Sequence, residues 1–222
     1  MSDIDRLRQR LVAGLAALPL ELPAATVERL LAYVQMLARW NATYNLSAVR
    51  DVDEMVTRHL LDSLAALRYV EGGTLVDLGS GGGLPGIPFA IAAPQRAVTL
   101  VDSNGKKTRF LRAAVRELKL DNVRVLECRV EAVEGTYDCV TARAFASLVD
   151  MLRWGGRLLA PDGLWLALKG RFPDEELAGV PAGFRVDRIE PLAVPGLDAE
   201  RHVVVIKRVR QDAPEQQESS GS

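Results

Sequence analysis

Apolar residues recur at helical spacing through the first third of the chain. Over residues 25–40 they fall every three or four positions, which predicts a helix with one buried face. A second helix is predicted over 51–67, because Asp51 can cap its first turn and Glu54 follows three residues later, as in a capping box. The segment between the two helices is rich in asparagine and serine and is predicted to be an ordered loop. The pattern therefore predicts a helical extension over residues 1–70.

From Thr74 onward, short apolar runs alternate with amphipathic stretches. The runs that predict strands are "TLVDL", "AVTLVD", "NVRVLE", "YDCVTAR", "GLWLALKG", "FRVDRIE" and "RHVVVIKR". Strands that alternate with helices predict a mostly parallel sheet with helices on both faces. The last two strands are joined by a segment without helical periodicity, so we expect them to form an antiparallel pair. We predict one α/β domain over residues 71–209 and a polar, disordered tail over 210–222.

The stretch "LVDLGSGGGLPGIPFA", residues 75–90, joins the first predicted strand to a short helix. Glycines at such a turn let the backbone bend tightly and let a ligand approach the main chain closely. Pro85 and Pro88 are tolerated here, because the first N–H groups of a helix have no acceptor within it. The stretch therefore predicts a cofactor site built from a strand end, a bare turn and a helix start.

Two cofactor classes use this arrangement, and the glycines fit both. Gly81, Gly83 and Gly86 satisfy the G-x-G-x-x-G spacing of dinucleotide-binding folds. Asp77, with Gly79, Gly81 and Gly83, instead satisfies the acidic-x-G-x-G-x-G pattern of methyltransferases that use S-adenosyl-L-methionine (AdoMet). The glycine pattern alone leaves both classes open.

Asp102 ends the second predicted strand, where its carboxylate can accept hydrogen bonds from the ribose hydroxyls of either cofactor. The length of the chain separates the two classes better. Only about 130 residues follow the turn, too few for the second half of a dinucleotide fold or a substrate domain. The antiparallel ending is typical of the seven-stranded methyltransferase sheet, and no lysine or arginine lies in the turn to meet a cofactor phosphate. We therefore interpret the site as one for AdoMet.

The segment after the fourth predicted strand narrows the choice of methyl acceptor. Methylation of a pyrimidine carbon needs a cysteine nucleophile there, and this loop contains none. Exocyclic amines usually require [Asn/Asp]-Pro-Pro-aromatic, where this chain has "TARA" at 141–144. A hydroxyl acceptor needs a base, for which Lys169 is a candidate, whereas a ring nitrogen needs none. Arg143 ends the strand and could hold a phosphate or the edge of a base. A ring nitrogen or an oxygen is therefore predicted as the acceptor.

Composition constrains the partners and the compartment. The net charge is −1 and the pI about 6.2, without the surplus of basic residues that nucleic-acid binding usually needs. Two cysteines, Cys128 and Cys139, are too few for a disulfide framework and are predicted to be reduced and buried in strands. The sequence shows neither a signal peptide nor an apolar run of bilayer-spanning length. A cytoplasmic protein is expected.

Several blocks of the sequence, taken together, resemble those of one known protein family. They are "VDLGSGGGLPGIPFAI", "LVDSNGKKTRFL", "TARAFASL", "ALKG", and the upstream "WNATYNLSAVR" and "RHLLDSL". Over roughly residues 20–208 the chain resembles the bacterial small-subunit ribosomal RNA guanine-N7 methyltransferases, formerly called glucose-inhibited division protein B. The resemblance implies a Rossmann-like AdoMet fold with an N-terminal helical extension. It also implies methylation at N7 of one guanosine in a loop of 16S rRNA near the decoding site.

The resemblance further implies roles for individual residues. Besides Asp77, Gly81 and Gly83 from the glycine pattern, the residues expected to contact AdoMet are Gly79, Leu84, Asp102, Val130, Glu131 and Arg143. Apart from the resemblance, Arg143 and Lys169 are expected to position the reactants, because each ends a predicted strand. An RNA substrate disagrees with the near-neutral net charge, so we expect a local basic patch of Arg58, Lys106, Lys107, Arg143, Lys169 and Arg201. We also expect a monomer without a metal site. Two alternative functions stay open: an O-methyltransferase of small molecules, and a non-catalytic module that binds AdoMet or a nucleotide.

Overall fold

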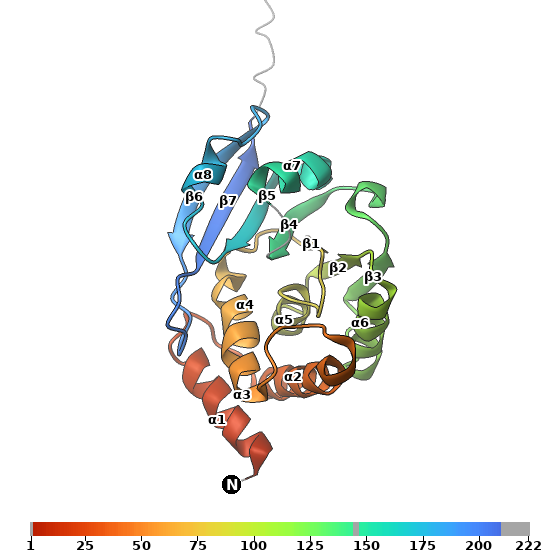
Figure 1. Ribbon diagram of the computed structural model, residues 1–222, viewed down its shortest axis with the longest axis vertical. Coiled ribbons are helices and arrows are strands. Elements are labelled where there is room, and N and C mark those ends of the chain that lie inside the picture. The colour runs from red at the N-terminus through yellow and green to blue at the C-terminus, as the bar shows by residue number, and fades with distance from the viewer. Residues whose placement is uncertain (1, 144–146, 210–222) are drawn as a thin grey trace, which may run out of the picture.

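A mixed sheet flanked by helices makes up the computed structural model of the chain, which describes residues 2–143 and 147–209 (Figure 1). The tail predicted to be disordered, 210–222, and residues 144–146 lie outside the described part. Within it, none of the helices combines the length and the hydropathy that a membrane span requires.

The sheet has the strand order β3-β2-β1-β4-β5-β7-β6. The strands are β1 (Thr74–Leu78), β2 (Ala97–Asp102), β3 (Val123–Glu127), β4 (Tyr137–Arg143), β5 (Leu159–Lys169), β6 (Phe184–Pro191) and β7 (His202–Arg208). Strands β1 to β5 run parallel, and β7 runs antiparallel to both β5 and β6. This arrangement confirms the predicted seven-stranded methyltransferase-like sheet and its antiparallel ending. The carboxyl ends of the parallel strands gather at one edge, where open α/β sheets bind ligands.

The first face of the sheet is covered by the N-terminal helices together with two helices from the α/β part. These are α1 (Asp3–Leu15), α2 (Ala24–Tyr44), α3 (Val52–Met55), η1 (Val56–Leu61), α4 (Asp62–Ala65), η2 (Leu67–Tyr69), α5 (Gly86–Ala92) and α6 (Gly105–Glu117). Their apolar faces form a single core with this side of the sheet, from Leu7 on α1 to Val205 on β7. Because this core joins both sides of the boundary predicted near residue 70, the division into 1–70 and 71–209 stays a prediction.

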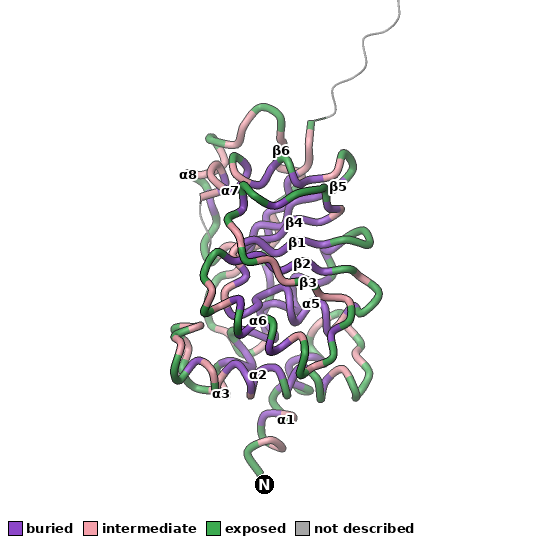
Figure 2. The backbone as a smooth tube through the Cα atoms, turned by 90° about the vertical axis from the view of Figure 1, so that its right-hand side faces the viewer, coloured by how far each residue is buried: buried purple, intermediate pink, exposed green. Residues whose placement is uncertain are grey.

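The second face is covered by shorter elements. These are η3 (Val130–Ala132), α7 (Leu148–Gly155), η4 (Gly156–Leu158) and α8 (Asp174–Leu177). A separate core cluster lies here, with Trp165 of β5 and Met151 of α7 fully buried in it. The five inner strands of the sheet are buried along most of their length, whereas the edge strands β3 and β6 are partly exposed (Figure 2).

The helix predicted over 51–67 is interrupted. Asp51 caps it as expected, since its carboxylate accepts the N–H of Asp53 at 2.7 Å. The predicted capping box is incomplete, because Glu54 pairs with Arg58 at 3.6 Å. After one turn of α-helix the chain forms a six-residue π-helix, η1, before α4 resumes the α-helical pattern. Such wider turns occur frequently at functional sites, and Arg58 and His59 of η1 line a cavity at the edge where the strands end.

Candidate active site

The glycine turn uses backbone conformations that other residues rarely adopt. Gly79, Gly81 and Gly83 have φ values of +69°, +58° and +87°. A Cβ on Gly83 would also lie 2.5 Å from Cδ1 of Ile87. Glycine is therefore required at this turn for conformation and, at Gly83, for space as well.

Asp77 fixes the end of β1 to the start of α5. It is fully buried, and its Oδ2 accepts the N–H of Gly86 at 3.1 Å, whereas Oδ1 has no partner among the described residues. Burial raises the pKa of Asp77 to about 7. A Cβ on Gly86 would lie 2.7 Å from Oδ2 of Asp77, so the helix can start this close only at a glycine.

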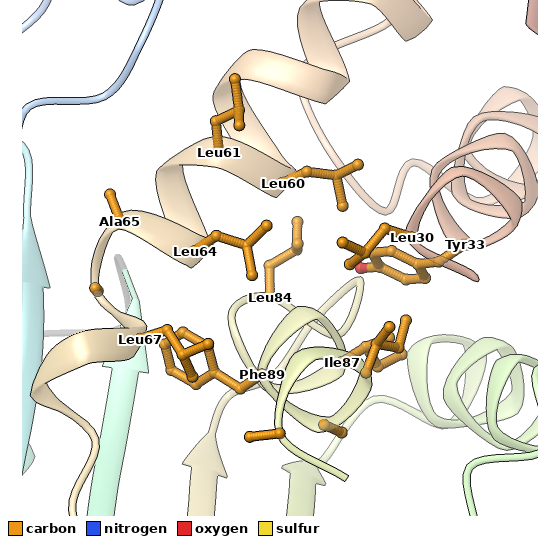
Figure 3. Packing of buried hydrophobic residues seen from close by; sticks show 14 of the residues in the cluster. Leu30, Tyr33, Leu60, Leu61, Leu64, Ala65, Leu67, Leu84, Ile87 and Phe89 are labelled. Carbon is orange, nitrogen blue, oxygen red and sulfur yellow. The ribbon is translucent and has the colours of Figure 1, made fainter. Parts of the chain in front are cut away.

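Hydrogen bonds from neighbouring elements hold the turn in place. The Ser80 hydroxyl donates to the carbonyl of Asp77 at 2.8 Å and accepts the N–H of Val101 at 3.1 Å. From α2, the Tyr33 hydroxyl donates to the carbonyl of Gly82 at 2.6 Å. The Leu84 side chain points into the core between the N-terminal helices (Figure 3). The turn is thus anchored on both sides.

Asp102 lies beside the turn at the end of β2. Its Oδ2 accepts the N–H of Gly81 at 2.9 Å, and its Oδ1 accepts the N–H of Asn104 at the same distance. The Nζ of Lys107 is 3.8 Å from Oδ2. Only 7% of Asp102 is exposed, yet the residue still lines a cavity. Each carboxylate oxygen has a lone pair left for a ligand.

That cavity, about 670 Å³, is the larger of two at the carboxyl edge of the sheet. It is lined by Gly79, Val101, Asp102, Ser103, Asn104, Lys107, Cys128, Arg129, Val130, Glu131, Arg143 and Trp154. Of the nine residues expected to contact AdoMet, five line it, namely Gly79, Asp102, Val130, Glu131 and Arg143. The other four are not among the lining residues: Asp77, Gly81, Gly83 and Leu84.

Both cysteines are free, as expected, but they differ in position. Cys139 is buried on β4, and burial raises the pKa of its thiol. Cys128 does not lie in a strand: it follows β3, is only partly buried and lines the larger cavity. The strand ends at Glu127, the last residue that pairs with β2, so Cys128 lies just beyond it and the prediction of a strand position was wrong for this cysteine.

The smaller cavity, about 340 Å³, adjoins the first at Arg143, which lines both. It is lined by Ser47, Ala48, Val49, Arg58, His59, Asp62, Arg143, Leu168, Lys169, Gly170, Leu192, Arg201 and His202. Four of the six residues of the expected basic patch, Arg58, Arg143, Lys169 and Arg201, gather here. The other two do not: Lys107 lines the larger cavity and Lys106 is exposed on α6.

Asp62 joins two of these arginines and was not found from the sequence. Its Oδ2 is 3.2 Å from an Nη of Arg143, and its Oδ1 accepts from Nε of Arg201 at 2.8 Å. Only 7% of Asp62 is exposed. An acidic residue on the apolar side of a predicted helix could have indicated a buried ion pair. Its partners could not be identified from the sequence, because they are 81 and 139 residues away.

His59 supports the loop that closes one side of the smaller cavity. Its Nδ1 lies 2.9 Å from the carbonyl of Arg58, which can only accept, so Nδ1 carries the proton. Its Nε2 then accepts from the Ser47 hydroxyl at 2.7 Å, and Ser47 Oγ in turn accepts the N–H of Val49. Burial lowers the pKa of His59 to about 4, so the imidazole is neutral.

Lys169, at the end of β5, forms an ion pair. Its Nζ donates to both carboxylate oxygens of Glu176, at 3.1 and 2.9 Å. Oε2 of Glu176 also accepts the N–H of Leu148 at the start of α7. This ion pair directs the Lys169 ammonium toward α8 and the start of α7, and the roles predicted for Lys169, in positioning and as a base, stay predictions.

A family model described as rRNA small subunit methyltransferase G matches residues 26–204, most of the chain. The chain belongs to this family. A ribosomal RNA small subunit methyltransferase G from Xanthomonas campestris pv. campestris (strain 8004) is 59% identical over 181 residues, covering 81% of this chain and 85% of that protein. The protein of the same name from Neisseria meningitidis serogroup C is 51% identical over 203 residues, covering 90% and 98%. Family membership confirms the resemblance and the methyltransferase class.

Solved structures agree on the fold. TrmN from Thermus thermophilus is similar with a TM-score of 0.56 and 20% identity, over 69% of this chain and 53% of that one. The putative methyltransferase yhhF from Escherichia coli gives a TM-score of 0.52 at 17% identity, over 68% and 87%. At such low identity these similarities show the fold alone.

Proposed function

We propose that the chain is an AdoMet-dependent enzyme that methylates N7 of one guanosine in 16S rRNA of the small ribosomal subunit. The proposal rests on the two adjoining cavities at the carboxyl edge of the sheet, which share Arg143. One cavity suits a cofactor and the other a base. The family supports the same reaction class, because its members carry the name rRNA small subunit methyltransferase G. A substrate in the ribosome also implies a cytoplasmic enzyme, and we propose that it acts as a monomer.

The residues that line the larger cavity fit AdoMet. Asp102 is nearly buried and keeps free lone pairs, as a receptor for ribose hydroxyls requires. Gly79 presents backbone without a side chain, so a ligand can approach the main chain there. Val130 offers an apolar surface for the adenine, and Glu131 adds a polar edge. We assign Asp77, Gly81, Gly83 and Leu84 to the support of the turn, behind the residues that touch the cofactor.

The residues of the chain position the reactants for methyl transfer. When bound, AdoMet supplies a methyl group activated on a sulfonium. Arg143 lies between the two cavities, where it can orient the cofactor and the incoming base together. Such orientation matters because in-line displacement requires the attacking nitrogen, the methyl carbon and the sulfur to be aligned. Guanine N7 carries its own lone pair in the ring plane and loses no proton, so no general base is required.

The smaller cavity suits the target guanosine and its phosphates. Asp62 holds the guanidinium groups of Arg143 and Arg201 toward one site, where they can bind phosphate or the edge of a base. Val49, Leu168 and Leu192 add apolar walls. We propose that Arg58 and Arg201 contact the RNA here, and that Lys106 and Lys107 do so at the start of α6.

The experiment combines purified enzyme and labelled AdoMet with 16S rRNA or small subunits that lack this modification. We expect label in one guanosine, mapped by borohydride and aniline cleavage, which is specific for N7-methylguanosine. Label on small hydroxylated acceptors alone would favour the O-methyltransferase alternative. AdoMet binding without any methylated RNA would favour the non-catalytic module.

A further inference from the structure

The outer face of α6 concentrates positive charge in a chain whose net charge is −1. The helix carries five basic residues and one acidic residue, Glu117. Four of the basic residues follow one another at intervals of three, three and four: Lys106, Arg109, Arg112 and Arg116. Residues at this spacing share one face of a helix, and all four are exposed.

A groove of about 370 Å³ runs along this face. It is lined by Trp40 of α2, by Arg109, Arg112 and Arg116 of α6 with two small residues of that helix, and by Glu127 of β3. We refer to it as the α6 groove. The Trp40 ring packs against Phe110 at 5.5 Å and Tyr44 at 5.3 Å, which fixes its orientation, while part of the residue remains exposed.

The charges in the α6 groove are only partly compensated. Arg112 pairs with Glu127 at 2.8 Å, and that carboxylate also accepts from the Thr108 hydroxyl at 2.7 Å. Arg109 and Arg116 form no ion pair or hydrogen bond through their side chains within residues 2–143 and 147–209. Two guanidinium groups are therefore available to an anionic partner on either side of a neutralised pair.

We propose that the α6 groove binds a single-stranded segment of the rRNA substrate outside the target guanosine, with phosphates on Arg109 and Arg116 and a base against Trp40. This inference rests on the proposed function. Guanidinium groups suit phosphate, and an exposed aromatic ring suits an unstacked base, a combination typical of single-strand recognition. The groove leads toward the reaction site, because Lys107 on the first turn of α6 lines the larger cavity. From Lys106 to Arg116 the helix extends for about 15 Å, enough for several phosphates.

The test measures binding of 16S rRNA fragments by filter binding between 50 and 200 mM salt. The variant is Arg109→Glu with Arg116→Glu, and both residues are exposed, so the fold is expected to persist. Its matched control is Arg29→Glu with Arg153→Glu, which changes the net charge equally at two exposed arginines of α2 and α7 that form no side-chain ion pair or hydrogen bond within the described residues. Trp40→Leu keeps an apolar side chain against Phe110 but removes the stacking surface.

We expect the Arg109/Arg116 variant to lose about tenfold or more in RNA affinity at low salt, with the salt slope reduced by about 1.4 for two lost contacts. Trp40→Leu is expected to lower affinity severalfold without changing that slope, since stacking is uncharged. AdoMet affinity by calorimetry should stay unchanged in both. Wild-type RNA affinity in the Arg109/Arg116 variant, or an equal loss in the control, would overturn the inference. If the wild type binds RNA through this groove but methylates none, the proposed function fails while the groove assignment stands.

Discussion

Asp62 shows how a single buried carboxylate can hold two arginines at one cavity. It lies between Arg143, at the end of β4, and Arg201, just before β7, and neutralises part of their charge. Without it, two guanidinium groups would repel each other at the mouth of the smaller cavity. Asp62 is therefore a positioning residue in this account.

The first prediction concerns Asp62→Asn, which keeps the shape of the side chain but removes its charge. Hydrogen bonds to charged groups contribute about 1.5–3 kcal/mol, so kcat/KM for rRNA methylation should fall roughly tenfold to hundredfold. AdoMet affinity should fall less than kcat/KM for rRNA, since Asp62 reaches the larger cavity only through Arg143, whereas it holds two arginines of the smaller one. Asp187→Asn, which alters a carboxylate paired with Arg185 on β6, is the control. Unchanged kinetics in the Asp62 variant would remove the residue from the site.

The second prediction concerns pH and Asp77. Burial raises its pKa to about 7, so the folded protein keeps a proton that the unfolded chain releases near pH 4. The protonation of Asp77 therefore stabilises the folded state fully below about pH 4, and this stabilisation is lost as the pH rises from about 4 to about 7. Asp77→Asn removes this titration, so the free energy of unfolding of the variant relative to wild type should rise with pH, by up to about 4 kcal/mol.

Denaturant titrations of both proteins between pH 4 and pH 8 measure this difference. His59 acts in the opposite direction, because its lowered pKa makes stability fall as the pH drops from about 6.5 to about 4. It is present in both proteins and cancels in the comparison. A difference that does not vary with pH would show that Asp77 ionises normally.

At the scale of elements, the glycine turn joins β1 to α5 with almost no free space. The sequence predicted the turn, the strand before it and the proline-containing helix start, because glycine and proline restrict the backbone locally. Pro85 in fact precedes α5, and Pro88 lies in its first turn. The π-helix η1 could not be predicted, since its apolar spacing resembles that of an ordinary helix and its wider turn depends on packing against the rest of the molecule.

The third prediction tests the close packing between the end of β1 and the start of α5. In Gly86→Ala, the new methyl group would lie 2.3 Å from Cδ2 of Leu100 as well as against Asp77. Overpacking of this kind costs about 1–3 kcal/mol, so the free energy of unfolding should fall by that amount. Gly183→Ala, where an added Cβ meets nothing within 4 Å, should change it by less than about 0.5 kcal/mol. Equal stability of the two variants would contradict the geometry of the turn.

At the scale of the whole molecule, function depends on bringing two distant parts of the chain to one sheet edge. The alternation of strands and helices predicted the sheet, and the glycine pattern together with the family resemblance predicted five of the twelve residues that line the larger cavity as contacts of AdoMet. The smaller cavity was harder to predict from the sequence, because η1 and α4 meet β4, β5 and β7 only through the packing of the helical core. Arg58 and Arg201 were selected for their charge, whereas Asp62 and His59 gain their roles from partners remote in sequence.

The central claim, methylation at N7 of one guanosine in 16S rRNA, is tested most directly in cells. N7-methylguanosine is counted by mass spectrometry of nucleosides from purified 16S rRNA, with and without the gene for this chain, and after its return on a plasmid. We predict that deletion removes one N7-methylguanosine per 16S rRNA and that the plasmid restores it, whereas a plasmid encoding the Asp62→Asn variant restores it only in part. An unchanged N7-methylguanosine content, or the loss of a different methylated nucleoside, would contradict the account.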